Sequence, residues 1–420
     1  MIAVGLMEGR SAVDVELAGV FRDASGMAYK PARYRFTSEV TLTPSDLASS
    51  SFALEDVTIG IGFHWERKER QVFRGALRII KRDAGLTVVN DVPLEEYVTS
   101  VISSEMSASC PIELLKAHAV ISRSWLLFPK EHPSPGAPAE REPVRAKPQE
   151  RAAGPEQGSH AREILRWYGR EAHPDFDVCA DDHCQRYQGI TKAFSPEAAN
   201  AVAATTGEFL RYNGMICDAR FSKCCGGITE RYSTAWEDQE IRYLESVYDG
   251  PEQARSYILE TWIRSDPPAY CNTHDSDLLS RILPGFDRET RDFYRWRVEY
   301  SPDELADLVK SRVGVDLGPI RDIEALARGP SGRIYRLKLS GERDYLFIGK
   351  ELEIRRALSR THLYSSAFVV DKELGRLVLR GAGWGHGVGL CQIGAAVMAN
   401  EGRTYKEILQ HYYRGTTVSA

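Results

Sequence analysis

Residues 381–390 alternate glycine with other residues, and the side chains between the glycines include Trp384 and His386. Glycine weakens regular strands and helices because it has the most backbone freedom to lose on folding. Such a run therefore indicates φ values closed to other residues, or a group lying very close to the backbone. Because an aromatic ring and an imidazole lie within it, we interpret the run as a surface built around a bound ligand. The alternative is a tight connection whose Trp and His are ordinary packing residues.

A single carboxylate, Glu105, stands at the break between two apolar helical stretches. Ile102 and Met106 flank it and small residues follow, so we expect its carboxyl group to be partly desolvated, which raises its pKa. A carboxylic acid of this kind can protonate a leaving oxygen and then take a proton back. The alternative is a capping or surface glutamate, since most glutamates are exposed.

Soft metal ligands gather between residues 173 and 184, where His173, Cys179 and Cys184 occur with an extra histidine, His183. Cysteine and histidine at short spacings are the ligands of zinc sites. A short disulfide between Cys179 and Cys184 is the alternative in an oxidising compartment. The fourth ligand could be water or another residue, because the sequence does not name one.

Adjacent cysteines occur in the segment Cys224-Cys225-Gly226-Gly227, where the glycine pair marks a tight loop after a strand-like run. Adjacent cysteines rarely bond each other because the geometry is strained, so one of them could pair with Cys217 or Cys271. A cysteine nucleophile needs a histidine partner and a lowered thiol pKa. No histidine lies nearby in the sequence, so we do not expect thiol catalysis.

The elements that must position these residues change in type along the chain. Residues 1–90 are β-rich, with period-two alternation at 13–17 and 57–61 and short strands at 73–79 and 86–89. Helical spacing follows at 93–102 and again, more strongly, at 112–127. Pro111 suits the first position of this second helix, with Ser109 or Cys110 as its cap. Apolar residues on nearly all its sides indicate a helix buried in a core.

The second half of the chain mixes both element types. We expect residues 129–161, which are rich in proline, to form a mobile surface loop. A helix is predicted at 301–309 and strands at 334–339 and 345–348. Two helices close the chain, one at 392–398 and one that starts with the capping box Thr404–Glu407 and ends before Gly415.

Strands and helices are segregated, without a βαβ rhythm, which predicts an α+β fold. We divide the chain into a β-rich region at 1–90, a helical catalytic core at 91–240 and 366–420, and a mixed α/β insert at 241–365. The chain has 420 residues, 43% of them hydrophobic and 27% charged, which is a globular composition.

The net charge of −5 provides no basic field for nucleic acid and no attraction to anionic lipid. We find no apolar stretch long enough to span a membrane, and the first residues lack the pattern of an export signal. A chain trimmed of its signal would look the same, so the sequence leaves the localisation open.

Four blocks, in order along the chain, resemble the stage II sporulation protein D family, which includes the amidase-enhancer proteins. They are residues 90–97, the stretch Ser-Glu105-Met through Lys116-Ala-His-Ala-Val to Arg123-Ser-Trp, residues 176–187 with Cys-Gln-Arg-Tyr, and Gly-Trp384-Gly-His-Gly-Val-Gly-Leu-Cys-Gln392. The resemblance covers about residues 85–240 and 320–420.

The resemblance implies an enzyme of the bacterial cell envelope that acts on peptidoglycan glycan strands. Sporulation members are lytic transglycosylases, which cleave the β-1,4 bond between N-acetylmuramic acid and N-acetylglucosamine and leave a 1,6-anhydro end. The resemblance places the catalytic glutamate on Glu105 and a structural zinc on His173, Cys179 and Cys184, with no organic cofactor. It assigns further positions to substrate binding: Lys116, Arg123, Gly226, Gly227, Thr229, Trp384, His386 and Gln392.

A single acid suits this reaction, because the C6 hydroxyl of the sugar itself attacks. A hydrolase needs two carboxylates about 5 to 9 Å apart, and Glu95 or Glu96 could supply the second. The main alternative is a non-catalytic wall-binding protein that enhances a separate N-acetylmuramoyl-L-alanine amidase. The chain departs from the family pattern at His118, Ile393 and Cys224-Cys225, which bears on substrate preference more than on reaction class.

Overall fold

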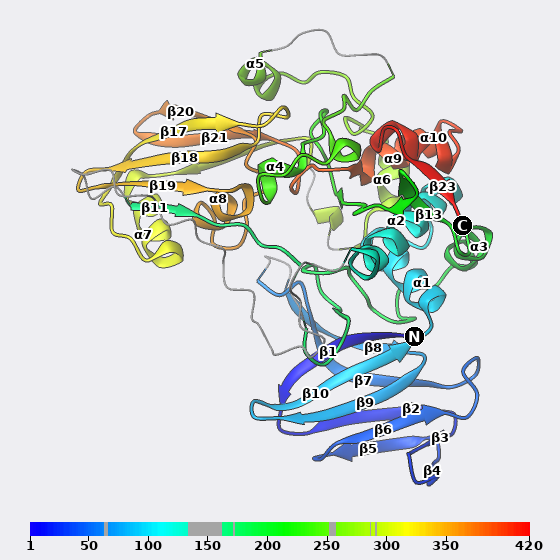
Figure 1. The fold of residues 1–420 in the computed structure, drawn as a ribbon. Coiled ribbons are helices and arrows are strands. Elements are labelled where there is room, and N and C mark those ends of the chain that lie inside the picture. Colours follow the sequence, from blue (N-terminus) through cyan, green and yellow to red (C-terminus); the bar gives the residue numbers. More distant parts are fainter. Residues whose placement is uncertain (63–65, 133–161, 171–172, 252–257, 286, 290–291) are drawn as a thin grey trace.

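The computed structural model describes residues 1–62, 66–132, 162–170, 173–251, 258–285, 287–289 and 292–420 (Figure 1). The chain folds into a β-rich N-terminal body, a group of helices and a mixed body of strands and helices. The predicted α+β class is confirmed. No helix among the described residues is long and apolar enough to cross a membrane.

The N-terminal body consists of two sheets whose inner faces share one hydrophobic core. One sheet has the order β12-β1-β10-β9-β6-β3-β4 and the other the order β5-β2-β7-β8. The strands are β1 (Ile2–Arg10), β2 (Val13–Ala18), β3 (Phe21–Arg22), β4 (Ala28–Tyr29), β5 (Ala32–Phe36), β6 (Val40–Pro44), β7 (Ser51–Ile59), β8 (Arg67–Phe73), β9 (Ala76–Arg82), β10 (Gly85–Val92) and β12 (Val178–Cys179).

The alternation predicted at 13–17 is confirmed in β2, where Val13, Val15 and Leu17 are buried and the residues between them point outward. The predicted single strand at 73–79 is wrong, because the chain turns between β8 and β9. Gly75 makes this turn with a φ of 97°, and a Cβ there would lie 2.4 Å from the carbonyl oxygen of Asp91. The strand predicted at 57–61 ends at Ile59.

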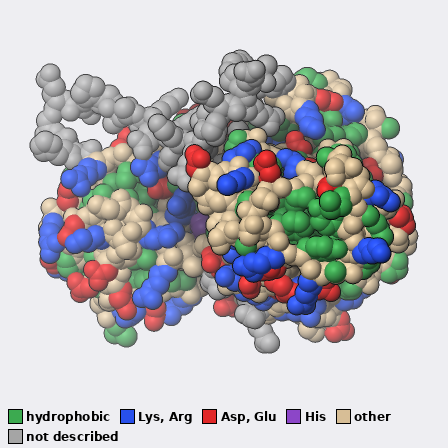
Figure 2. Space-filling view, turned by 90° about the horizontal axis from the view of Figure 1, so that it is seen from below, with side chains coloured by type: hydrophobic (Ala, Val, Ile, Leu, Met, Phe, Trp, Pro, Cys, Tyr) green, Lys and Arg blue, Asp and Glu red, His purple; other side chains and the backbone are tan. Residues whose placement is uncertain are grey.

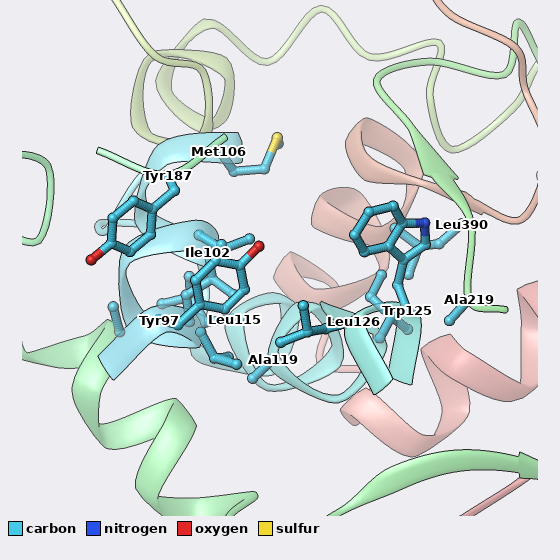
Figure 3. Packing of buried hydrophobic residues seen from close by; sticks show 14 of the residues in the cluster. Tyr97, Ile102, Met106, Leu115, Ala119, Trp125, Leu126, Tyr187, Ala219 and Leu390 are labelled. Carbon is cyan, nitrogen blue, oxygen red and sulfur yellow. The ribbon is translucent and has the colours of Figure 1, made fainter. Parts of the chain in front are cut away.

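Both helices predicted after the first sheets are confirmed, as α1 (Leu94–Glu105) and α2 (Ile112–Glu131). The buried character of α2 is confirmed as well, but its predicted cap is wrong: Pro111 itself is the N-cap and no side chain caps the helix. Figure 3 shows Tyr97 and Ile102 of α1 near Leu115 and Ala119 of α2, with Met106 directly after the end of α1; all belong to one hydrophobic core. This packing fixes the end of α1, where Glu105 lies.

The remaining helices around α2 include the two predicted at the C-terminus. These are α9 (Gln392–Asn400) and α10 (Tyr405–Tyr412), the latter with the predicted capping box of Thr404 and Glu407. The other short elements in this part are α3 (Pro196–Ala204), β13 (Phe209–Tyr212), β14 (Met215–Ile216), β15 (Phe221–Ser222), α4 (Tyr232–Ala235), α6 (Ser276–Ile282), β22 (Leu390–Cys391) and β23 (Thr417–Ser419), with 3-10 turns at Arg242–Leu244 and Asp287–Glu289.

The mixed body has its own hydrophobic core, which includes Trp296, Leu337 and Leu379. Its two sheets have the orders β11-β19-β18-β17 and β16-β21-β20, with α7 and α8 against them. Its elements are β11 (Arg162–Leu165), β16 (Arg295–Tyr300), α7 (Pro302–Val313), β17 (Ile320–Arg328), β18 (Ile334–Gly341), β19 (Tyr345–Gly349), α8 (Glu351–Ala357), β20 (Phe368–Glu373) and β21 (Arg376–Ala382). The helix α5 (Leu259–Arg264) packs against β20 and β21 of this mixed body. The helix predicted at 301–309 and the strands at 334–339 and 345–348 are confirmed.

The proline-rich stretch 129–161 lies mostly outside the described residues, except that residues 129–131 continue α2. Seen from below, the N-terminal body and the mixed body form two rounded lobes with a depression between them (Figure 2). Acidic and basic side chains are interspersed over both lobes on this face.

Candidate functional site

The glycine-rich run makes room for groups of the protein itself. Gly383, Gly385, Gly387 and Gly389 all have positive φ, between 73° and 95°. A Cβ on Gly387 would lie 2.4 Å from the guanidinium carbon of Arg333, and one on Gly383 would lie 2.8 Å from the carbonyl oxygen of Cys224. The close approach inferred from the sequence is therefore real, but the approaching groups belong to the core and not to a ligand.

Arg333 is fully buried and directly precedes β18. Its guanidinium donates to the carbonyl oxygens of Gly385 and Cys225, each at 3.1 Å, and to the hydroxyl of Ser331. Ser331 in turn donates to the buried carboxylate of Glu230 at 2.6 Å. Arg333 thus connects the mixed body to the loop after β15 and to the glycine-rich run.

The run holds the segment of residues 221–225 in place. β15 pairs in parallel with β22, and the backbone groups of Cys224 and Trp384 bond each other in both directions. This pairing aims the side chain of Lys223 at the end of α1, where its ammonium donates to the backbone carbonyl of Glu105 at 2.8 Å. A lysine at this position satisfies a carbonyl that has no partner within the helix, and its charge complements the helix dipole.

Glu105 is the last residue of α1 and only 8% exposed. Its Oε1 accepts a hydrogen bond from the backbone N–H of Arg186 at 3.0 Å. Burial raises the pKa of the Glu105 carboxyl above its ordinary value, against the opposing charges of Arg186 and Lys223. The desolvation expected from the sequence is therefore present, and a raised carboxyl pKa is suited to general acid catalysis.

Two cations and two carboxylates surround this acid. Lys223 forms an ion pair with the fully buried Asp287 at 2.8 Å, and Arg186 lies between Asp287 and Asp182. Burial opposes ionisation of Asp287, but the charges of Lys223 and Arg186 hold its pKa below the ordinary value. Asp287 is therefore the carboxylate that stays ionised, while Glu105 is the one that can hold a proton.

Glu95 and Glu96 do not accompany Glu105. They lie in the first turn of α1, and at 1.5 Å per residue the ten residues between Glu95 and Glu105 correspond to about 15 Å. This exceeds the separation of a glycosidase carboxylate pair. Glu95 instead forms an ion pair with Arg123 at 2.7 Å.

Two predicted substrate-binding residues near the acid's helix have partners within the protein. Arg123 has no exposed side-chain surface and binds Glu95, Val202 and Thr205, which joins α1 and α2 to α3. Lys116 is partly buried and pairs with Glu113. The structure leaves no surface of Arg123 for a substrate.

The loop after the adjacent Cys224 and Cys225 contains three predicted substrate-binding residues, Gly226, Gly227 and Thr229. The Thr229 hydroxyl is buried and accepts from the backbone N–H of Val247 at 2.7 Å. Gly227 faces the rings of Trp262 and Tyr294, where a Cβ would lie within 2.9 Å of either ring system. These positions shape the loop from inside.

The three predicted binding residues of the C-terminal motif, Trp384, His386 and Gln392, have different surroundings. Gln392 is buried, and its Nε2 lies 2.9 Å from Nε2 of His118. His386 packs edge-on against Trp236, and burial together with nearby arginines holds its pKa well below the ordinary value, so it is neutral. Trp384 lines a cavity of about 190 Å³ with Tyr300 and Tyr364, and Glu105 is not among the residues lining that cavity.

The metal-ligand candidates come together. One donor atom from each of His173, Cys179, His183 and Cys184 lies within 4.8 Å of all the others. The thiol of Cys184 is 3.5 Å from His173 and 3.6 Å from His183, and neither Cys179 nor Cys184 forms a disulfide. The set has the two sulfur and two nitrogen donors that a tetrahedral zinc site needs, and His183 would supply the fourth ligand that the sequence leaves unnamed.

The sequence does not predict the four charged residues that matter most at the site: Arg186, Lys223, Asp287 and Arg333. Arg186 follows the predicted metal segment by two residues, and Lys223 directly precedes the predicted tight loop, so neither belongs to a motif of its own. Asp287 and Arg333 have no motif around them. In sequence, a lone arginine just before a strand resembles a surface residue, and only the contacts of Arg333 show that it is buried.

Comparison with known proteins gives two family matches. Residues 82–212 match the family described as Stage II sporulation protein, and residues 230–389 match a Domain of unknown function (DUF8618). The chain is 26% identical over 333 residues to Stage II sporulation protein D of Bacillus amyloliquefaciens, covering 79% of this chain and 75% of that protein.

Two further relatives come from Bacillus subtilis. Stage II sporulation protein D is 23% identical over 331 residues, covering 79% of this chain and 76% of the relative. The Amidase enhancer is 25% identical over 237 residues, covering 52% of this chain and 32% of the relative.

Substitution of Gly387 by alanine tests the packing of the run on Arg333. Gly402 also has positive φ, but nothing lies within 4 Å of a Cβ there. We expect Gly402→Ala to cost about 1–2 kcal/mol for backbone strain, and Gly387→Ala to cost about 1–3 kcal/mol more for the overlap with Arg333. The measurement is denaturant unfolding of both variants; equal losses would contradict the packing.

Substitution of Glu105 by glutamine tests the raised pKa through stability. A carboxyl group with a raised folded-state pKa makes the protein less stable as pH rises from its ordinary value of 4.5 through the folded pKa. Glu105→Gln is therefore expected to raise the melting temperature relative to the wild type at pH 8 and to have little effect at pH 4. The control is Glu96→Gln, a half-exposed residue of the same helix, and the idea fails if Glu105→Gln is the less stable protein at pH 8.

Proposed function

Since this chain belongs to the stage II sporulation protein D family, we propose that it is a peptidoglycan lytic transglycosylase with Glu105 as its acid and base. The observation that carries the proposal is the Glu105 carboxyl, buried at the end of α1 with a raised pKa and set among two cations. The substrate is the glycan strand of peptidoglycan, and the place of action is the cell envelope outside the cytoplasm.

In the first step, neutral Glu105 gives its proton to the glycosidic oxygen, and the bond from that oxygen to C1 of N-acetylmuramic acid breaks. The new carboxylate is stabilised by the N–H of Arg186 at 3.0 Å and by the positive charges of Arg186 and Lys223. In the second step, the carboxylate takes the proton of the C6 hydroxyl, whose oxygen bonds to C1. The products are a 1,6-anhydro end and a free hydroxyl on the leaving sugar, and Glu105 regains its proton.

The charge pairing around Glu105 favours this reaction over hydrolysis. Hydrolysis needs a second carboxylate that is free to activate water or to attack C1. Asp287 is paired with Lys223 and Asp182 with Arg186, so one oxygen of each carboxylate is engaged by a cation. An intramolecular hydroxyl removes the need for a second base.

The cluster of His173, Cys179, His183 and Cys184 would hold a structural zinc ion. Cys179 lies in β12, which pairs with β1 of the N-terminal sheet, and Arg186 follows Cys184 by two residues. Fixing this loop therefore fixes the N–H that bonds Glu105. Such a site closes its ligand shell with protein atoms and contributes to folding.

The second candidate function is enhancement of a cell-wall amidase without cleavage. It is favoured by the similarity of 237 residues to a protein named Amidase enhancer. The partner would then be an N-acetylmuramoyl-L-alanine amidase, and Glu105 would have no chemical part.

Glu105→Gln should reduce release of anhydro-muropeptides from purified glycan strands by about 10²–10⁴-fold, the usual contribution of a general acid and base. The measurement is mass spectrometry of the products over time. Glu96→Gln is the matched control, because Glu96 lies in the same helix and only meets Arg74 at the surface, 3.6 Å away; it should keep the wild-type rate.

Three other outcomes separate the alternatives. Wild-type rates from Glu105→Gln would refute the acid assignment, and reducing ends in place of anhydro ends would identify a hydrolase. Glycan binding without cleavage by the wild type, together with stimulation of an added amidase, would establish the enhancer function.

The zinc site is tested by its fourth ligand. His183→Asn should lower the zinc content of the purified protein by about one ion per chain, because only three ligands of the cluster remain. Cys179→Ser should have the same effect, and His274→Asn, on an exposed histidine outside the cluster, should not. Metal analysis by mass spectrometry measures all three, and an unchanged content in His183→Asn would contradict its role.

A further inference from the structure

A second group of metal-ligating side chains lies in the core behind the glycine-rich run. The thiols of Cys225, Cys271 and Cys391 and a carboxylate oxygen of Asp249 all lie within 4.8 Å of one another. Each of these residues is at most 2% exposed. Four chain segments far apart in the sequence meet at this point, with no residue shared with the cluster at 173–184.

The carboxylate is the unusual member of the group. Asp249 is fully buried, and it accepts from the hydroxyl of Tyr412 at 2.6 Å, the N–H of Cys271 at 3.0 Å and the thiol of Cys225 at 3.4 Å. None of these donors carries a charge, and burying a carboxylate costs a great deal of free energy unless a cation accompanies it. The core also makes space for it, since a Cβ on Gly394 of α9 would lie 2.5 Å from its Oδ1.

The sulfur positions distinguish a metal from a disulfide. The Sγ atoms of Cys225 and Cys271 are 3.6 Å apart, whereas a disulfide bond is about 2.05 Å long. Two sulfurs bound to one tetrahedral zinc at about 2.3 Å lie roughly 3.8 Å apart. Backbone hydrogen bonds already orient the ligands, with the N–H of Cys225 donating to Cys391 Sγ at 3.2 Å; outer hydrogen bonds of this kind accompany metal ligands.

We propose that Cys225, Cys271, Cys391 and Asp249 bind one zinc ion, separate from the ion of the 173–184 cluster. Three thiolates and one carboxylate form a closed tetrahedral set, which is the pattern of a structural site. On binding, each thiol releases its proton to the solvent and the sulfur lone pair bonds to the metal, with no change of oxidation state.

The proposed ion lies close in sequence to Lys223, which contacts the end of α1 at the candidate active site. Cys225 follows Lys223 by two residues and precedes Gly226, and Cys391 ends β22 just before Gln392. The backbone carbonyl of Lys223 also accepts from the N–H of Ile393 at 3.1 Å. The ion therefore fixes the segment that carries Lys223 to the end of α1, and it acts as a positioning element, not as a reactant.

The experiment counts zinc in the purified full-length chain and in three variants. The wild type is expected to hold two ions per chain, Cys179→Ser one, and Cys179→Ser combined with Cys271→Ser none. Cys217→Ser is the matched control, since Cys217 is equally buried but outside both clusters, and it should keep two ions. One ion in the wild type that disappears with Cys179→Ser alone would overturn the proposal.

Two measurements on protein without a substitution at this cluster keep the test decisive if Cys271→Ser fails to fold. X-ray absorption of the Cys179→Ser protein should show a zinc shell of three sulfurs near 2.3 Å and one oxygen. Titration of unfolded wild type without reductant should find all eight thiols. A disulfide between Cys225 and Cys271, located by peptide mass spectrometry, would overturn the proposal, as would iron with acid-labile sulfide in place of zinc.

Discussion

The buried guanidinium of Arg333 is the constraint on which the glycine-rich run and the loop after β15 depend. Arg333 has no exposed surface, so its hydrogen bonds are made with groups inside the protein. The carbonyls of Gly385 and Cys225 accept from its Nε and Nη1, and the Ser331 hydroxyl accepts a third bond and donates to Glu230. Its Nη2 has no acceptor among the described residues. Because the carbonyls have to point inward, the chain around Arg333 bends through φ values that favour glycine. The cation, the glycines and the loop after β15 therefore depend on each other.

The same arrangement raises the pKa of an acid that lies close to two cations. Burial of the Glu105 carboxyl raises its pKa and outweighs the opposing charges of Arg186 and Lys223, and the charge of Asp182 adds to the rise. The ammonium group of Lys223 donates to the backbone carbonyl of Glu105 and not to its carboxylate. A lysine placed on the carboxylate itself would lower its pKa and remove the proton that the proposed reaction requires.

Local patterns in the sequence predict the local structure well. Periodicity identifies α1, α2, β2 and β10, and the capping box at Thr404 marks a true helix start. Failures occur where a contact distant in the sequence decides the outcome. The turn at Gly75 depends on Asp91, and the meaning of the glycine-rich run depends on Arg333, which precedes it by about fifty residues. The desolvation of Glu105 was predictable from Ile102 and Met106, whereas Lys223 and Asp287, which set its charge environment, carry no local signal.

The dispersal of the residues around Glu105 has a consequence for the order of events in the cell. Their positions run from 105 to 287, with 186 and 223 between, and the last of them leaves the ribosome long after α1. Contacts between such distant positions form late in folding, because the loops between them must close first. A chain interrupted before residue 287 would contain Glu105 without Asp287. The proposed activity would thus arise only in molecules made beyond that residue and folded.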